Sequence, residues 1–469
     1  MSIDVASQVV DLVRAASPGA EAEVVVEGGE LALTRFANSF IHQNVADATT
    51  NVRLRLHVDG RTAAGSAVIP EQSQPGSTSD GEVLGRLVER TLAVARLAPL
   101  DPQWPGLAPA APVSTVPPLD EATAHAEPAQ RAARVRDFVA AAGGLEAAGY
   151  CSTYRVSTAF ANSAGMSGSS VTALAAFNGI ARSGRSDGVA RLASSRLADL
   201  DGARLGARAA AKARSGLEPR ELPPGRYEVV LEPTAVVDIL HGLALYGFNG
   251  KAVNEGRSFV TLGAAQFDSS VSIVDDPFDP RGPAPAFDVE GTPKQRRFLV
   301  EAGTSATVAH DRRSGAKAGA PSTGHAVPGG AAYGALPTNL HLLPAGGTED
   351  GDPGEVDGPA ADAAVAALVG QVARGLLVSD FWYTRVLDPR TLVMTGLTRN
   401  GVWLIEDGVV TGPVQNFRFT QSYPQSLGPG AVLGIGSHSV GVPSDWEGIS
   451  SRAPALRLAS WNFTGNPSG

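Results

Sequence analysis

The feature that most constrains the fold is the segment LEPRELPPG at residues 217–225. Its final prolines and glycine interrupt regular structure, because proline lacks a backbone donor and glycine has little conformational preference. Helix-like and strand-like patterns alternate before this segment, whereas mostly strand-like patterns follow it. A chain of 469 residues is long enough for two domains that each bury a core. We therefore predict an N-terminal domain over residues 1–220 and a C-terminal domain over residues 221–469.

The N-terminal domain is predicted to be α+β, with an antiparallel sheet and flanking helices. Alternating apolar and charged residues at 51–58, followed by Asp59 and Gly60, are typical of a strand that enters a hairpin. The segment 22–45 is expected to form another hairpin that turns at EGGE, residues 27–30. The periodicity further predicts helices over 4–16, 82–98, 121–142 and 203–216, a proline-rich loop over 99–118, and a third hairpin over 171–200.

The C-terminal domain is predicted to be mostly antiparallel β, like a barrel or sandwich, with few helices. Helices are expected over 233–246 and 360–378, and a long glycine-rich loop over 312–358 that is either functional or mobile. Strands are expected at 226–233, 271–276, 296–303, 391–410 and 455–463.

Charge and cysteine content limit the possible partners and compartments. The net charge is −9 and no basic stripe is present, so we expect no nucleic-acid binding. A single cysteine, Cys151, cannot form an internal disulfide, which favours a reducing cytoplasm. The acidic N-terminal residues do not fit a signal peptide, and the apolar stretch 363–378 is too short and too interrupted to span a bilayer. We expect a cytoplasmic protein without a membrane partner.

The stretch HGLALYG, residues 241–247, contains a histidine on a predicted helix. A zinc-peptidase helix needs two histidines on one face and a glutamate beside the first, which takes a proton from the bound water. Here Gly242 follows His241, and Leu245 and Tyr246 lie one turn further on. No other pair of histidines has a suitable spacing. The sequence therefore favours a hydrogen-bonded helix histidine over a metal ligand.

Four other segments have a possible chemical role and a more ordinary interpretation. GRSDG at 184–188 matches the pattern of a nucleophile elbow, but its position between two strands favours a hairpin turn. Cys151 is expected to be a core residue. The carboxylates within 275–290 offer oxygen ligands for a cation, although the spacing fits no EF-hand. STGH at 322–325 could line a cleft, but a mobile surface loop is the commoner explanation.

Nine segments, in order along the chain, together resemble the TldD/PmbA family, known as modulators of DNA gyrase and as metallopeptidases. They are TRFANSFIHQNV (34–45), AFANSAG (159–165), GRYEVVLEPTAVVDIL (225–240), NEGRSFV (254–260), VDDP (274–277), FDVEGTPKQRRFLVEAG (287–303), STGHA (322–326), PTNLHLLPAGG (337–347) and GVWLIEDGVV (401–410). The resemblance covers nearly the whole chain and implies a heterodimer. It also implies that a TldD-type subunit carries a zinc helix with HExxxH and a late cysteine ligand, which a TldE (PmbA) subunit lacks.

The resemblance aligns His241, Gly242 and Tyr246 with the first histidine, the glutamate and the second histidine of that helix. The late cysteine is also missing, since Cys151 lies in the other half of the chain. This implies a TldE-like subunit with no catalytic residue and no metal of its own, and zinc in a TldD-like partner. The pair would act on an unfolded or flexible peptide, a substrate that suits strand addition to a sheet edge.

Two other functions remain open. The chain could be a subunit of a TldD/TldE-like amide hydrolase recruited to specialised metabolism, or a homodimeric peptide-binding module without catalysis. In each case the candidate residues for contact with substrate or partner are His241, Tyr246, Arg257, Ser322 and His325.

Overall fold

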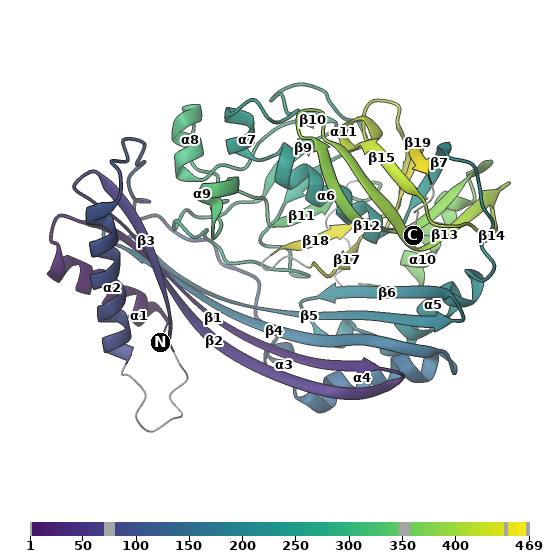
Figure 1. Ribbon diagram of the computed structural model, residues 1–469, viewed down its shortest axis with the longest axis horizontal. Coiled ribbons are helices and arrows are strands. Elements are labelled where there is room, and N and C mark those ends of the chain that lie inside the picture. The colour runs from purple at the N-terminus through teal and green to yellow at the C-terminus, as the bar shows by residue number, and fades with distance from the viewer. Residues whose placement is uncertain (1, 70–79, 347–356, 445–448, 466–469) are drawn as a thin grey trace.

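The computed structural model describes residues 2–69, 80–346, 357–444 and 449–465. The first half of the chain folds into a long curved sheet with helices. The second half is built around a barrel and lies along the concave side of that sheet (Figure 1). The first sheet uses residues 21–194, and the strands of the second half all come from residues 225–465. The α+β fold class predicted for the chain is confirmed.

The first sheet is antiparallel throughout, in the order β3-β2-β1-β4-β5-β6. Its strands are β1 (Glu21–Ala37), β2 (Phe40–Val58), β3 (Arg61–Ile69), β4 (Glu146–Asn162), β5 (Ser167–Ser183) and β6 (Ser186–Ser194). The predicted hairpin at Asp59 and Gly60 is present between β2 and β3. The GRSDG segment also turns between strands, but at Gly184 and Arg185, so Asp187 and Gly188 lie within β6.

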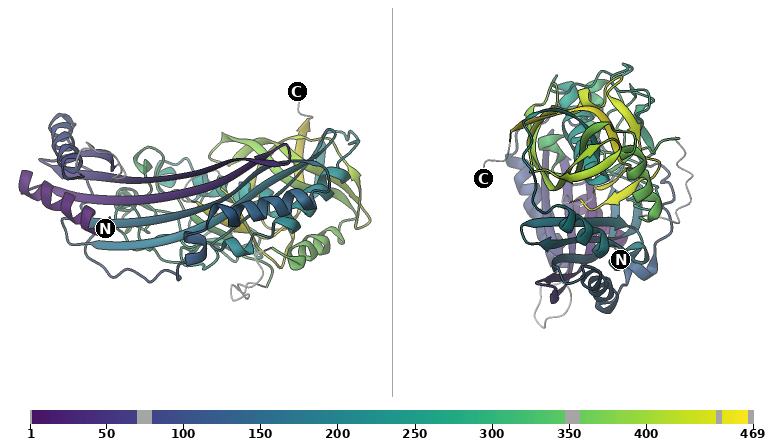
Figure 2. Two further views of the ribbon diagram at one scale, coloured as in Figure 1. Left: turned by 90° about the horizontal axis from the view of Figure 1, so that it is seen from below. Right: turned by 90° about the vertical axis from the view of Figure 1, so that its right-hand side faces the viewer.

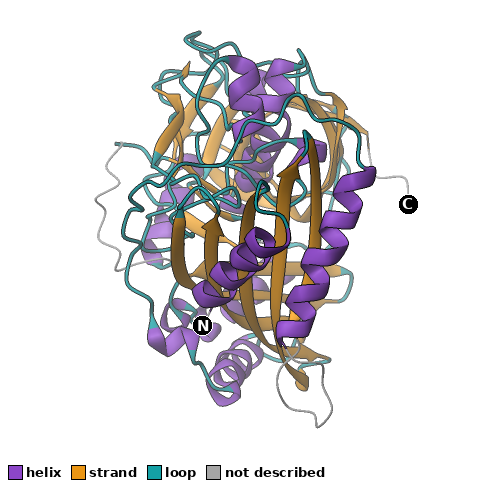
Figure 3. Cartoon of the chain, turned by 90° about the vertical axis from the view of Figure 1, so that its left-hand side faces the viewer, coloured by secondary structure: helices purple, strands orange, loops and turns teal. Residues whose placement is uncertain are grey.

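The helices of the first half form two groups, one at each end of the sheet. Figures 1 and 3 show α1 (Ser2–Ala16) and α2 (Asp80–Leu97) together at one end. They bury valines and leucines against β1 and β2. Figure 2 shows α4 (Pro128–Ala141) and α5 (Gly202–Ser215) near the other end. There Phe36, Phe138 and Phe177 form an aromatic core that also contains Cys151. Short turns of helix, α3 (Glu121–Ala124) and η1 (Leu197–Asp199), lie between these elements.

The expected hairpin turn at EGGE is wrong, because β1 runs straight through it. Gly28 and Gly29 are paired in the sheet on both sides, and a side chain at either position would meet a neighbour at under 3 Å, Ser157 Oγ at 2.6 Å and Tyr154 Oη at 2.7 Å respectively. These glycines therefore make room for cross-strand side chains. The actual turn is at Asn38 and Ser39, which both have positive φ, as the tightest hairpins require.

Two predicted helices also differ from the structure. The segment 121–142 is broken before Pro128, which begins α4 after Glu127 caps it. The segment 360–378 forms α10 (Pro359–Val369) only as far as Val369, and β12 begins at Arg374. Burial explains the second difference, because Leu376 and Val378 belong to the core of the barrel.

The second half contains a closed five-strand barrel, seen as a ring in the right-hand view of Figure 2. Its strands are β7 (Gly225–Leu231), β12 (Arg374–Asp388), β13 (Val393–Glu406), β15 (Arg418–Ser422) and β19 (Leu456–Gly465). The ring closes because β12 pairs with β7 on one side and β13 on the other. The strands β14 (Val409–Pro413) and β16 (Val432–Ile435) extend it, and α11 (Tyr423–Ser426) follows β15.

A second, smaller sheet lies beside the barrel, in the order β10-β9-β8-β11-β18-β17. It contains β8 (Ile273–Asp275), β9 (Arg297–Glu301), β10 (Thr304–Ser305), β11 (Asn339–Leu342), β17 (Val440–Val442) and β18 (Ser450–Ala453). The remaining helices are α6 (Pro233–Gly242), the turn η2 (Leu243–Gly247), α7 (Gly250–Asn254), α8 (Arg312–Ala318) and α9 (Gly330–Tyr333).

The expected loop over 312–358 is therefore not a single loop. It contains α8, α9 and β11, and its residues 347–356 lie outside the described part. Within the described residues, no helix is long and apolar enough to cross a membrane.

Candidate functional site: a helix that lacks zinc ligands

The helix α6 runs between the barrel and the second sheet. Pro233 occupies its first turn, where a missing N–H costs nothing, and most of its residues are buried. It continues into η2, a single π-helical turn in which Phe248 N donates to Leu243 O at 2.8 Å. Single π-turns inside helices are frequently found at functional sites. The expected helix over 233–246 is thus confirmed, with an altered last turn.

His241 is half-buried near the end of α6. Its Nε2 atom is 2.9 Å from Ser451 Oγ on β18, a buried hydroxyl. Ser451 is in register with Leu340 of β11, and Leu340 is in register with Asp275 of β8. The imidazole therefore forms a hydrogen bond that ties the helix to the second sheet.

Gly242 has no room for a larger side chain. A Cβ atom at this position would lie 2.9 Å from Cε2 and 3.0 Å from Cδ2 of Tyr423. Tyr423 is fully buried and stands at the start of α11, so its ring has little freedom to move aside. The space in which a glutamate would begin is filled by an aromatic ring.

Tyr246 is half-buried and packs against the barrel core. It lies in the π-turn η2, one residue before that turn ends. The backbone keeps the spacing of an HExxxH motif, while the side chains at its second and last positions are unsuited to binding zinc or activating water.

A buried carboxyl takes part in the packing around Gly242. Asp238, one turn earlier on α6, accepts hydrogen bonds from Tyr423 Oη at 2.5 Å and from Thr384 Oγ1 at 2.8 Å. Burial raises the pKa of Asp238 to about 6, although these two hydrogen bonds oppose the shift. Burial and the Asp238 carboxylate also raise the pKa of Tyr423. The tyrosine is thereby held in place by a network inside the barrel.

The donors near His241 do not fit a zinc ion. Structural and catalytic zinc sites use three or four protein ligands. Among the described residues, no group of three or more His, Cys, Asp and Glu side chains is arranged to hold a metal. Cys151 is buried in the core of the first half, where burial raises its pKa to about 12. The residues around α6 therefore do not fit the ion.

The other candidate residues lie at separate places. Arg257 is exposed and pairs locally with Glu255, with Nε 2.8 Å from Oε2. Ser322 is half-buried and donates to the carbonyl of His310 at 3.1 Å. His325 is buried at 1% exposure, with Nε2 3.0 Å from Asp275 Oδ2 and Nδ1 2.8 Å from Thr323 Oγ1. The STGH segment is thus largely buried and not the surface loop that its glycine content suggested.

Thr323, His325 and Asp275 form a hydroxyl–imidazole–carboxylate chain that resembles a catalytic triad, but its role here is structural. Thr323 Oγ1 also accepts from His310 N at 2.7 Å and lies 3.1 Å from His310 O, so the hydroxyl is fully engaged. Burial would raise the pKa of Asp275, but His325, Lys294 and a backbone N–H of Asn339 lower it to about 2. This ionised Asp275 fixes the STGH segment against β8.

The remaining acidic residues of 275–290 are also bound to protein groups. Asp279 pairs with Arg281 at 2.7 Å, and Asp276 with Arg296 at 3.3 Å. Asp288 accepts from the backbone N–H groups of Glu290, Thr292 and Ala326. These carboxylates stabilise the loops in which they lie.

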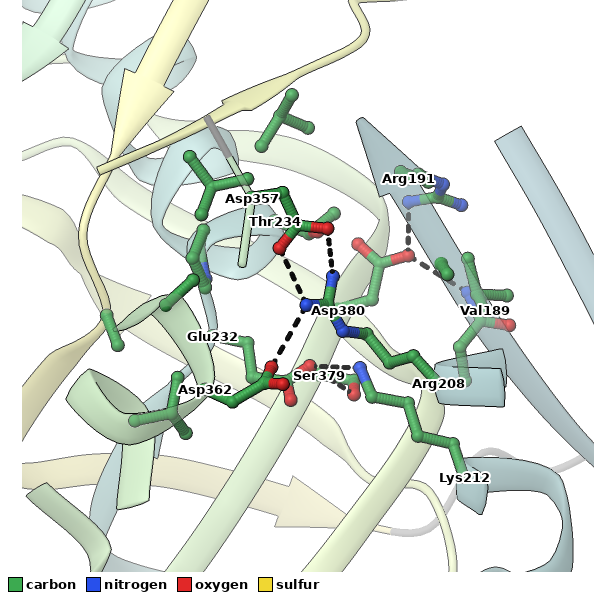
Figure 4. Close-up of a pocket in the computed structure, with 18 of the residues that line it drawn as sticks. Val189, Arg191, Arg208, Lys212, Glu232, Thr234, Asp357, Asp362, Ser379 and Asp380 are labelled. Atoms are coloured by element: carbon green, nitrogen blue, oxygen red, sulfur yellow. Dashed lines mark hydrogen bonds and ion pairs between the residues drawn. The ribbon is translucent and has the colours of Figure 1, made fainter. Parts of the chain in front are cut away.

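Sequence reasoning missed a charged cavity between the two halves, shown in Figure 4. Its volume is about 70 Å³, and α5, β6, β12 and α10 contribute to its walls. Arg191 Nη1 is 2.6 Å from Asp380 Oδ2, and Lys212 pairs with Glu232. Arg208 lies between two carboxylates, 2.6 Å from Asp357 and 3.0 Å from Asp362.

Charges of both signs meet inside this cavity, so its residues satisfy one another. Burial raises the pKa of Asp380, while Arg191 and Asn400 act in the opposite direction. These ion pairs connect the first half of the chain to the second half. Arg191 and Asp380 are 189 positions apart along the chain, and Arg208 and Asp357 are 149 apart, so no local motif marks these pairs.

The fold and site define an α+β protein whose helix α6, continued by η2, has the spacing of an HExxxH motif but glycine and tyrosine at two of its three key positions. Residues 224–465 match the family described as the PmbA/TldA metallopeptidase C-terminal domain, and the chain belongs to that family. A comparison with curated proteins found no match.

Solved structures with the same fold include TldE from Thermococcus kodakarensis, at 16% identity and a TM-score of 0.80 over 99% of each chain. A proposed modulator of DNA gyrase from Thermotoga maritima is 18% identical, with a TM-score of 0.77 over 98% of this chain and 100% of that one. A similarly described protein from Bacteroides thetaiotaomicron is also 18% identical, with a TM-score of 0.77 over 98% of each chain. At these identities the likeness establishes the fold alone.

Proposed function

We propose that this chain is the non-catalytic, TldE-like subunit of a heterodimeric zinc peptidase of the cytoplasm, whose zinc is held by a TldD-like partner. The observation that carries the proposal is the packing at Gly242. The ring of Tyr423 occupies the space where a general base would begin, and the ring is fixed by Asp238 and Thr384.

Two physical arguments support an inactive subunit. One imidazole, already hydrogen-bonded to Ser451, cannot hold zinc against water. A bound water would in addition lack a neighbouring carboxylate to accept its proton, because glycine stands beside the histidine. The likeness in fold to TldE from Thermococcus kodakarensis, over 99% of each chain, supports this role.

The role of the chain in the pair would be to complete the cleft and help hold an extended peptide. The buried helix α6 with its π-turn suits this role, because it forms part of a rigid scaffold while the chemistry is left to the partner. We expect the peptide to bind by main-chain pairing at a sheet edge, which is largely independent of its sequence.

The test compares the isolated chain with the chain co-expressed with a TldD-like protein. Zinc content is measured on each purified species, and hydrolysis of flexible peptides is followed. We expect substoichiometric zinc and no turnover for the isolated chain, and zinc with peptide hydrolysis for the complex. The variant His241→Ala should leave the zinc content of the complex unchanged.

Other outcomes would favour other functions. Stoichiometric zinc together with turnover by the isolated chain would refute the proposal. A zinc-containing complex that hydrolyses only amides of conjugated metabolites would favour the specialised hydrolase. A stable homodimer that captures peptides without a second subunit would favour the binding module.

A further inference from the structure

The outer surface of the barrel carries two consecutive exposed aromatic residues, Trp382 and Tyr383 on β12. Their exposures are 43% and 63%, and Leu387 on the same strand is 59% exposed. Side chains alternate between the two faces of a regular strand, so two neighbours both facing water require a local irregularity. Large exposed aromatics are uncommon on a surface that faces only solvent.

The irregularity is a β-bulge. The register between β12 and β13 shifts between Trp382 and Arg385, so that Tyr383 and Thr384 have no partner in the ladder. Tyr383 has a φ of +57°, a left-handed conformation that is strained for a non-glycine residue. The bulge directs Thr384 toward Asp238 and leaves Tyr383 in solvent. Strain of this kind clusters at sites of function.

Arginines surround these aromatics. The guanidinium carbon of Arg399 lies 4.4 Å from the centre of the Trp382 ring, and that of Arg385 lies 4.2 Å from the centre of the Tyr383 ring. Arg418 is in register with Leu397, which is in register with Trp382, so it lies on the same outer face. All three arginines are exposed, and none pairs with a carboxylate in the described part of the chain.

We infer that this aromatic–arginine patch binds the catalytic partner subunit, and that the facing surface of the partner has carboxylates around an apolar centre. The patch consists of Trp382, Tyr383, Arg385, Leu387, Arg399 and Arg418. The inference rests on the proposed function and names the surface through which the two subunits meet. Tryptophan, tyrosine and arginine are the residues that dominate binding energy in protein interfaces.

The positive charge of the patch indicates an acidic surface on the partner. Three exposed arginines that pair with no carboxylate among the described residues form a local positive area, which an acidic surface would complement. Stacked arginine and aromatic side chains also occur where single-stranded nucleic acid binds. The overall negative charge opposes that alternative, because nucleic-acid affinity depends on a broad positive surface.

The experiment measures binding of the TldD-like partner to the full chain and to four variants. Tyr383→Gly is the most diagnostic, because glycine accepts a positive φ without strain. We expect its thermal stability to equal or slightly exceed that of the wild type, while its affinity for the partner falls about tenfold or more. Trp382→Ala and Arg399→Glu should weaken binding at least as much. Leu97→Ser, at an 88% exposed position on α2, is the matched control and should bind normally.

Each result bears on the inference. Normal binding by Tyr383→Gly, Trp382→Ala and Arg399→Glu would overturn the inference and leave the proposed function standing. Absence of a wild-type complex would overturn both. Loss of stability in Tyr383→Gly, or binding of a single-stranded oligonucleotide that Arg399→Glu abolishes, would show that the patch serves another purpose.

Discussion

Asp238 shows how one residue links the packing around Gly242 to the stability of the barrel. Its carboxyl is buried with a pKa of about 6, against 3.8 for an ordinary aspartate. The folded chain therefore holds a proton on Asp238 at pH values where the unfolded chain has lost it. Stability from this group is complete below pH 3.8, falls as the pH rises toward about 6, and then stays level.

The variant Asp238→Asn should remove this part of the pH dependence. Asparagine cannot ionise, so we expect the free energy of unfolding to change less between about pH 4 and about pH 6 than in the wild type, by up to about 3 kcal/mol. Urea unfolding at several pH values measures this difference. Asp11→Asn, at an exposed position on α1, is the control and should leave the profile as it is. An unchanged profile in Asp238→Asn would mean that Asp238 is ionised in the folded chain.

At the scale of elements, β6 and β17 meet almost backbone to backbone where the two halves of the chain join. A Cβ atom on Gly441 would lie 2.3 Å from the carbonyl oxygen of Ala193. The contact continues at Ser195, whose N–H donates to Arg281 O at 3.0 Å and whose hydroxyl donates to Pro280 O at 2.7 Å. Glycine is required here by proximity, since a backbone carbonyl cannot move aside alone.

Gly441→Ala should therefore separate these strands and destabilise the junction. We expect a loss of about 2 kcal/mol or more in the free energy of unfolding, measured by urea titration. Gly412→Ala on β14 is the matched control, because a Cβ atom there would meet nothing within 4 Å. Equal stability of the two variants would show that the halves are not held together at this point.

Elements also show how far the sequence could be used to predict the structure. The helix over residues 4–16 and the hairpin at Asp59 were predictable, because local periodicity and turn residues determine them. Gly28 and Gly29 led to the wrong prediction of a hairpin turn. They lie within β1, where they leave space for the side chains of Tyr154 and Ser157 on β4. His241 and Gly242 were recognisable by motif, but the ring of Tyr423 beside them was not, because 181 residues separate Gly242 from Tyr423.

At the scale of the whole molecule, a buried ion network joins the far end of the first sheet to the second half. Arg55 on β2 lies 2.5 Å from Glu23 on β1 and 2.7 Å from Glu290 of the second half. Burial raises the pKa of Glu23 to about 7, although Arg55 opposes this shift. The Glu290 carboxylate also accepts from the backbone N–H of Arg312.

Arg55→Met should remove the cation that contacts the two buried carboxyls of Glu23 and Glu290. We expect a loss of about 3–5 kcal/mol in the free energy of unfolding at neutral pH. The loss should be smaller near pH 5, where Glu23 is protonated in the folded chain. The triple variant Glu23→Gln, Arg55→Met, Glu290→Gln should recover most of the stability, because no charge then remains buried. A triple variant as unstable as Arg55→Met would contradict this electrostatic explanation.

The unbroken course of β1 and β2 has a mechanical consequence. The ion pair of Arg55 with Glu290 joins the second half to the first sheet near one end of that sheet. The ion pair of Arg191 with Asp380 joins them near the opposite end. The two halves cannot rotate relative to each other about one of these ion pairs unless the other ion pair breaks. A hinge motion of the two halves is therefore not expected to admit a large substrate. Access would have to come from movement of loops or from a space between separate chains.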